Sequence, residues 1–225
     1  MMTPSLVVLT TGPACYNPFQ ALTPPDDPAR VAQVGILDGM STPQILAAFA
    51  AEPEEAAIML RLPPGERVWL SLSRLQHAFQ QKINQLEAQG VESIVLCYSP
   101  EMPPLTAAHA VLMDAGRLLP TLMTGILGGR KGGILLPDEA LIPAQRKRWQ
   151  NTPSPPCFAA ACPWQSDDNG LYDAGLALQE QGAEAIVIDC PGFTPRHRAR
   201  LQALLGIPVL LTTEMLLSLA HEVAA

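Results

Sequence analysis

The chain alternates short apolar runs with amphipathic segments, and this alternation restricts the fold more than any other feature. Continuous apolar runs that are separated by helical patterns are typical of parallel strands with helices on both faces of the sheet. We therefore predict an α/β fold built on mostly parallel sheets. The expected strands from the middle of the chain onward are Ser93–Cys97, Gly132–Leu136, Cys157–Ala161, Ala185–Asp189 and Val209–Leu211, and the expected helices are Ala115–Leu127, Asp138–Gln150, Gly170–Gln181, Pro195–Leu205 and Glu214–Glu222.

The first part of the chain follows the same pattern with one interruption. Pro63-Pro64-Gly65 separates two extended pieces and predicts a hairpin or a tight turn. Thr42-Pro43 provides an N-cap and a first-turn proline for a helix. The expected strands are Ser5–Thr10, Val31–Leu37, Ala57–Leu62 and Arg67–Leu72, and the expected helices are Gln44–Ala51 and Ser73–Gln89.

One segment of the chain is repeated. Leu86–Leu96 matches Leu178–Ile188, with Gly90 and Gly182 at the same place in each copy. One interpretation is convergence, because helix–glycine–strand units in α/β proteins resemble one another. The other is two related, pseudo-symmetric lobes within a single unit of residues 1–225. The lobes would be residues 1–100 with 208–225, and residues 101–207.

Composition excludes several classes of protein. The net charge of −7 repels phosphate backbones, so we expect no nucleic-acid partner. No apolar stretch reaches the ~18 residues of a membrane helix, and Met1–Thr10 lacks the basic residue of a signal peptide. The odd number of cysteines, 5, fits reduced thiols. We therefore expect a cytoplasmic protein without membrane contact, metal or cofactor, and a homodimer is one assembly compatible with the sequence.

Ligands of open α/β sheets bind beyond the carboxyl ends of the strands. Cys190 follows such a strand and precedes a helix that Thr194-Pro195 begins. A helix amino terminus lowers the pKa of a nearby thiol, so Cys190 could be a thiolate near neutral pH, although the neighbouring Asp189 acts in the opposite direction. The alternative is an ordinary buried cysteine. The other candidate residues after strands are Thr10, Thr11, Gly12, Tyr98, Ser99, Pro191 and Gly192.

Several stretches along the chain resemble the AroM family, which is part of the aspartate/glutamate racemase-like superfamily. The most specific of these is Asp189–Arg198, with the sequence DCPGFTPRHR. The other matching stretches are Leu6–Gly12, Val91–Ser99, Arg117–Pro120, Leu136–Glu139, Gln145–Gln150, Asp173–Gly175 and Pro208–Leu211. AroM proteins have no settled activity, so the resemblance implies a fold and a superfamily but no reaction.

The superfamily resemblance implies two α/β lobes with a small carboxylate ligand between them. Its racemases use two cysteines on opposite sides of the substrate, and Cys190 matches the second of these. The repeat aligns Tyr98 with Cys190, whereas Cys97 stands one residue earlier, where strand alternation turns it to the opposite side. A loop could still bring Cys97 into the cleft as the first catalytic cysteine; the alternative is a site with Cys190 alone. Members with one cysteine include decarboxylases of malonate-type acids. Thr10 and Thr11 match the place where the superfamily binds the substrate carboxylate; an ordinary turn is the alternative.

Three functional hypotheses follow from these residues. The first is an enzyme of the racemase, isomerase or decarboxylase type that acts on a small carboxylate or dicarboxylate. In it, Cys190 donates or accepts the proton, while Thr10, Thr11, Ser99 and the amides around Gly192 hold carboxylates. The second is a non-catalytic metabolite-binding or regulatory protein that keeps the cleft. The third is an interaction scaffold without a small ligand.

Overall fold

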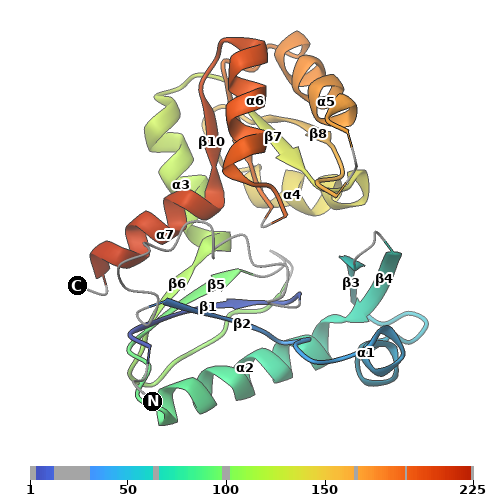
Figure 1. Ribbon diagram of the computed structural model, residues 1–225, viewed down its shortest axis with the longest axis vertical. Helices are drawn as coiled ribbons and strands as arrows, with labels where there is room; N and C mark the ends of the chain where they lie inside the picture. The colour runs from blue at the N-terminus through green and yellow to red at the C-terminus, as the bar shows by residue number, and fades with distance from the viewer. Residues whose placement is uncertain are drawn as a thin grey trace. The chain divides into compact units, whose positions relative to one another are not determined.

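The computed structural model describes residues 4–12, 31–62, 66–97, 102–164, 167–190 and 192–223 (Figure 1). The chain divides into two compact units, which are described separately. Unit 1 comprises Met1–Gly116 and Leu217–Ala225, and unit 2 comprises Arg117–Leu216. Each unit contains a four-stranded sheet in which all pairs are parallel.

Unit 1 has the strand order β2-β1-β5-β6. A separate antiparallel pair, β3-β4, confirms the hairpin predicted around Pro63–Gly65, although these turn residues themselves lie outside the described residues. The elements of the unit are β1 (Leu6–Thr10), β2 (Val31–Gly35), α1 (Thr42–Phe49), β3 (Ala57–Leu62), β4 (Glu66–Ser71), α2 (Leu72–Ala88), β5 (Ser93–Cys97) and β6 (Val111–Asp114).

Helix α2 covers one face of the unit 1 sheet. Its apolar residues recur every three or four positions, so they form one stripe along the helix. This stripe is buried against alternate residues of β1 and β5, among them Leu9 and Leu96. Because strand side chains alternate between faces, Cys97 lies on the face of the sheet opposite α2. The buried α2 residues are Leu75, Phe79, Ile83 and Leu86.

Unit 2 has the strand order β10-β9-β7-β8. Its elements are α3 (Ala115–Leu127), which starts in unit 1, β7 (Gly132–Leu136), the 3₁₀ helix η3 (Glu139–Leu141), α4 (Ile142–Trp149), β8 (Cys157–Ala160), α5 (Asn169–Glu180), β9 (Ala185–Ile188), α6 (Pro195–Leu205), β10 (Val209–Leu211) and α7 (Thr212–Val223), which ends in unit 1.

Helices cover both faces of the unit 2 sheet. Ile188 of β9 packs with residues of α5 and α6, including Leu178 and Leu201. Val187, the preceding residue, packs on the other face with Met123 of α3 and Trp149 of α4. This alternation confirms the predicted arrangement of parallel strands with helices on both faces.

The two units repeat one topology. Strands β1, β2, β5 and β6 correspond in chain order and in position to β7, β8, β9 and β10. The matching segments found in the sequence are α2–β5 and α5–β9, and their glycines, Gly90 and Gly182, have φ angles of 86° and 89°. Left-handed backbone of this kind favours glycine, which explains why both copies keep it. The predicted α/β fold with two pseudo-symmetric lobes is confirmed.

The structure differs from the sequence prediction in detail. Strand β6 was not predicted, and the predicted helix 138–150 is divided into η3 and α4. The N-cap of α1 is Ser41, one residue before the predicted Thr42. Unit 2 comprises residues 117–216, whereas the expected second lobe comprised residues 101–207. The reason is strand pairing, since β6 pairs with β5 and β10 pairs with β9.

Candidate functional site

The carboxyl edge of the unit 2 sheet, where the strands end, carries the residues of the strongest sequence motif. Asp189 and Cys190 follow β9 directly. Cys190 packs in the same cluster as Ile188, on the side of α5 and α6. Asp189 forms an ion pair with Arg148 of α4, on the opposite side. The alternation of the strand therefore continues beyond its end and separates the carboxylate from the thiol.

Cys190 is a buried thiol with a backbone partner. Its side chain is 9% exposed, and the N–H of Gly192 donates a hydrogen bond to Sγ at 3.2 Å. The segment after β8 packs closely here, since a Cβ added at Gly192 would lie 2.7 Å from Cγ of Pro163 and 3.0 Å from Cζ2 of Trp164. Gly192 is thus required for close packing next to the thiol.

Burial raises the pKa of Cys190 to about 12, and the charge of Asp189 acts in the same direction. The hydrogen bond from Gly192 lowers the pKa by less than burial raises it. The expectation of a lowered pKa is therefore wrong. The sequence places the thiol before a helix, but desolvation by residues distant in sequence decides its protonation state. Cys190 is a neutral thiol at pH 7.

The amino end of α6, which was expected to lower the pKa of Cys190, is capped by its own residues. The N–H of Thr194 donates to Nδ1 of His197 at 3.0 Å, and Thr194 completes a capping box. The ring of His197 packs edge-on against Phe193 at 5.5 Å between centroids. Burial also lowers the pKa of His197, which keeps Nδ1 available as the acceptor.

Arg148 is a residue of this edge that the sequence did not single out. Its Nη1 lies 2.8 Å from Oδ2 of Asp189, and the two side chains are 9% and 12% exposed. The same Nη1 donates to Oε1 of Gln145 at 3.2 Å, and Trp149 donates to that oxygen as well. The available signal was spacing, since Arg148 stands three residues after Gln145 and beside Trp149, both buried.

At the carboxyl edge of unit 1, the predicted residues Thr10 and Cys97 lie on adjacent strands and are paired in register. Thr10 and Thr11 are each 6% exposed. The hydroxyl of Thr10 donates to the carbonyl of Gly12 at 3.0 Å and closes the turn after β1. The hydroxyl proton of Thr10 is therefore engaged within the chain.

The structure brings Thr10, Thr11, Gly12 and Cys97 together in unit 1, and Cys190 and Gly192 together in unit 2. Tyr98, Ser99 and Pro191 lie outside the described residues. The hydroxyls of Ser71, the last residue of β4, and of Ser73 in α2 donate to Oε1 of Glu55.

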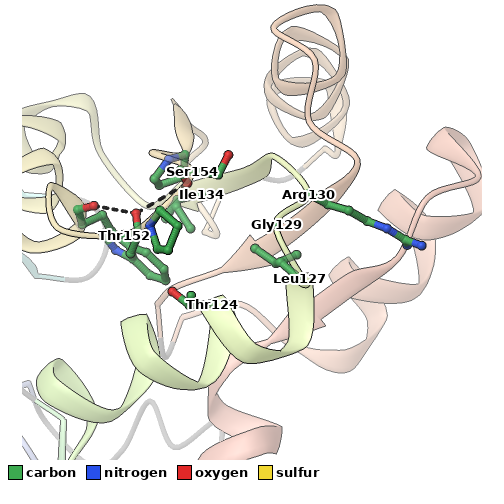
Figure 2. A pocket seen from close by; sticks show the side chains of 10 residues that line it. Thr124, Leu127, Gly129, Arg130, Ile134, Thr152 and Ser154 are labelled. Atoms are coloured by element: carbon green, nitrogen blue, oxygen red, sulfur yellow. Dashed lines mark hydrogen bonds between the residues drawn. The ribbon is translucent and has the colours of Figure 1, made fainter.

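A pocket of about 390 Å³, open solvent included, lies in unit 2 away from these residues (Figure 2). It is lined by residues that precede β7 and β8, such as Gly129 and Pro156, so it belongs to the amino ends of the strands. The hydroxyls of Thr124 and Thr152 donate to backbone carbonyls of the chain. Figure 2 shows the side chain of Arg130 extending away from the other lining residues. The lining therefore offers few polar groups to a ligand.

Among the described residues, no group of three or more His, Cys, Asp or Glu side chains is arranged to hold a metal ion. No helix among them has the length and apolar character needed to cross a membrane.

Solved structures with the same fold include racemases and a decarboxylase. Allantoin racemase from Pseudomonas fluorescens superposes with a TM-score of 0.61 at 13% identity, covering 97% of this chain and 89% of that one. Unliganded arylmalonate decarboxylase gives 0.58 at 13% identity, covering 99% and 93%. The aspartate racemase of Picrophilus torridus gives 0.54 at 14% identity, covering 98% and 94%. These similarities establish a racemase-like fold.

Sequence comparison identifies the family. No protein of curated function matches the chain significantly. The family model described as AroM protein matches residues 19–224, almost the whole sequence. This match includes Asp189–Arg198, the stretch with the most specific resemblance to the family. The chain therefore belongs to the AroM family.

Proposed function

We propose that this protein is an enzyme that uses the thiol of Cys190 to transfer a proton to a carbon atom next to a carboxylate. The observation that supports the proposal most directly is the buried, neutral thiol at the carboxyl end of β9, which accepts a hydrogen bond from Gly192. A group with a raised pKa is a proton donor in its resting state, whereas a base would first have to lose its proton.

This protonation state favours a decarboxylase-type reaction on a malonate-type acid over a racemase-type reaction. In decarboxylation, the bond between Cα and one carboxyl carbon breaks, CO₂ leaves, and the electron pair remains on Cα as an enediolate. The S–H bond of Cys190 then breaks, its proton forms a C–H bond at Cα, and the resulting thiolate takes a proton from water. Racemisation by two bases needs a second group opposite Cys190. Cys97 does not occupy the equivalent position, because Cys97 pairs with Thr10 at the place that corresponds to Asp189.

The test is turnover in D₂O with malonate-type diacids and with single enantiomers of 2-substituted carboxylic acids. We expect CO₂ release with one deuterium at Cα of the product, read by NMR. Cys190→Ala should lower the rate by about 10²–10⁴-fold, the range of general acid catalysis. Cys157→Ala is the matched control. Cys157 is equally buried, at 8% exposure, and its Sγ donates to the carbonyls of Gly132 and Leu178.

Equal turnover in Cys190→Ala and wild type would refute the role of Cys190. A second function, metabolite binding without turnover, is favoured by the mismatch between Cys97 and Cys190. It predicts saturable binding of a small carboxylate that persists in Cys190→Ala, with no CO₂ release and no deuterium incorporation in either protein. Binding titrations with small carboxylates, together with the turnover assay in D₂O, decide between the two functions.

The remaining features of the proposal concern the surroundings of the protein. The net charge of −7 supports a small anionic ligand taken up at a specific site rather than a nucleic-acid partner. The described cysteines form no disulfide bonds, which supports action in a reducing compartment such as the cytoplasm. A homodimer is the proposed assembly, and analytical ultracentrifugation tests it.

A further inference from the structure

Helix α7 begins without a capping side chain. Its first residue, Thr212, follows Leu211, the last residue of β10, and a leucine side chain cannot accept a hydrogen bond. The first N–H groups of any helix have no partner within the helix. In α6, by contrast, Thr194 and His197 supply a capping box. The amino end of α7 therefore presents amide donors that its own N-cap does not satisfy.

A buried hydroxyl lies in the same first turn. The side chain of Thr213 is 1% exposed, and its Oγ1 has no hydrogen-bond partner among the described residues. An unpaired buried hydroxyl is costly, and an unoccupied ligand site is one of the explanations for such a group. A threonine hydroxyl can donate or accept, whereas the amides of the first turn only donate, so an acceptor is the one kind of partner that satisfies both.

This helix end belongs to the sheet edge that carries Cys190. In the parallel pair β9–β10, Leu211 lies opposite Ile188. Cys190 follows Ile188 by two residues, and Thr213 follows Leu211 by two residues in the first turn of α7. Both residues belong to unit 2 and lie at the carboxyl edge of neighbouring strands, which is the edge where ligands of parallel sheets bind.

The acidic side chains nearest this end are paired within the unit. Glu214, in the first turn of α7, forms an ion pair with Arg198 of α6. Asp189, next to Cys190, forms an ion pair with Arg148. Their charges are therefore partly compensated, which reduces the repulsion of a third carboxylate, and helix dipoles favour an anion at the amino end.

We propose that the hydroxyl of Thr213 and the amino end of α7 bind a carboxylate of the substrate beside the thiol of Cys190. This rests on the proposed function for the identity of the ligand as a small carboxylic acid. A carboxylate held there places the adjacent Cα at the thiol, so the substrate class is an acid that keeps one carboxylate throughout the reaction. A malonate-type diacid, which loses the other carboxylate, fits this requirement. Both groups are buried, so the surrounding segments must open to admit the ligand.

The test compares Thr213→Val with Thr213→Ser, using malonate as the probe in calorimetric titrations. Valine keeps the shape of the side chain and removes only the hydroxyl, whereas serine keeps the hydroxyl. We expect Thr213→Val to weaken malonate binding by about 10- to 100-fold, the effect of one hydrogen bond to a charged group. Thr213→Ser should bind within about 2-fold of wild type, because its hydroxyl remains. Tm should rise and not fall in Thr213→Val, because the substitution removes a buried hydroxyl that has no partner among the described residues.

Thr124→Val is the matched control. The hydroxyl of Thr124 donates to the carbonyl of Pro120 at 2.8 Å, and this threonine lines the pocket at the amino ends of the strands. The Thr124→Val substitution should lower Tm, because this hydrogen bond is lost, and should leave the affinity for malonate unchanged.

Malonate binding that is equal in Thr213→Val and wild type would overturn the subsite and leave the proposed function standing. A lower Tm in Thr213→Val would also overturn it, since the hydroxyl would then have a partner in the protein. Binding that depends on Thr213, without turnover that depends on Cys190, would support the subsite and refute the proposed function. No malonate binding by the wild type would refute both.

Discussion

The ion pair between Arg148 and Asp189 should be worth more to unit 2 than an ordinary surface ion pair. Both side chains are almost buried, at 9% and 12% exposure, and Nη1 lies 2.8 Å from Oδ2. At this distance the attraction is about 6 kcal/mol with an effective dielectric constant of about 20. Desolvation of the two charges offsets much of it. Removal of Arg148 alone leaves a carboxylate without its partner, which costs about 3–5 kcal/mol.

Arg148→Met is the appropriate perturbation, because methionine keeps the apolar stem that packs beside Trp149 and removes the guanidinium. The double variant Arg148→Met/Asp189→Asn removes both charges and should recover at least half of the loss. Lys147→Met, at an exposed position of the same helix, should change stability by less than about 0.5 kcal/mol.

The assay is urea unfolding followed by circular dichroism, with hydrogen exchange of peptides from β9 to assign the loss to unit 2. A change below about 1 kcal/mol in Arg148→Met would refute the reasoning, because it would mean that Asp189 is solvated without its partner. Equal losses in the single and double variants would refute it too, since the cost would then come from packing and not from charge.

Three further predictions follow from the structure. Burial raises the pKa of Cys190 to about 12, above its value in the unfolded chain. The stability that the protonated thiol contributes is therefore complete below about pH 8.5 and is lost at about 1.4 kcal/mol per pH unit as the pH rises toward 12. The unfolding free energies of wild type and Cys190→Ala should converge between pH 8 and 11, and parallel curves would contradict this. Gly192→Ala should displace Pro163, whose Cγ would lie 2.7 Å from the new Cβ, and should therefore speed alkylation of Cys190 by iodoacetamide; an unchanged rate would show that this contact does not protect the thiol. Hydrogen bonds from the backbone N–H groups of residues 108–110 lower the pKa of Glu87. The stabilising effect of the Glu87 carboxylate is therefore present above its pKa in the unfolded chain, and it is lost as the pH falls through the lower pKa of the folded protein. Hydrogen exchange at residues 108–110 should be faster in Glu87→Gln than in wild type at pH 7, and equal protection in the two proteins would refute the assignment.

Helices and strands could be predicted where residues close in sequence determine where the element begins and ends. Gly206 ends α6 with a φ of 67°, a left-handed conformation that glycine adopts without strain, and Thr194 begins the same helix, so α6 was predicted to the residue. Strand β6 has no such signal. It consists of Val111–Asp114, with one fully buried residue, Met113, and it lies at the edge of its sheet. Its extended conformation depends on pairing with β5, which a local pattern does not contain.

The candidate site could likewise be predicted only in part. The position of Cys190 after a strand could be predicted because strand and helix signals on both sides of it are local. Its protonation state could not be predicted, because the thiol is desolvated in a cluster that includes Ala161 of the segment after β8, which is distant in sequence. The partner of Asp189 is equally remote, since Arg148 belongs to another helix. Pairing and burial are properties of the folded chain, and they decide the chemistry of a residue that the sequence can only place.

The position of Cys97 shows what a single residue of register means for this chemistry. Thr10 pairs with Cys97 in unit 1, and the pairing of β7 with β9 puts Asp189 at the corresponding place in unit 2. Because strand side chains alternate between faces, a cysteine at the place of Asp189 points away from the side on which Cys190 lies. The repeat thus supplies one thiol in the orientation of Cys190 among the described residues. A mechanism in which one thiol delivers a proton needs no second cysteine, and this is the physical reason for preferring decarboxylation to two-base racemisation.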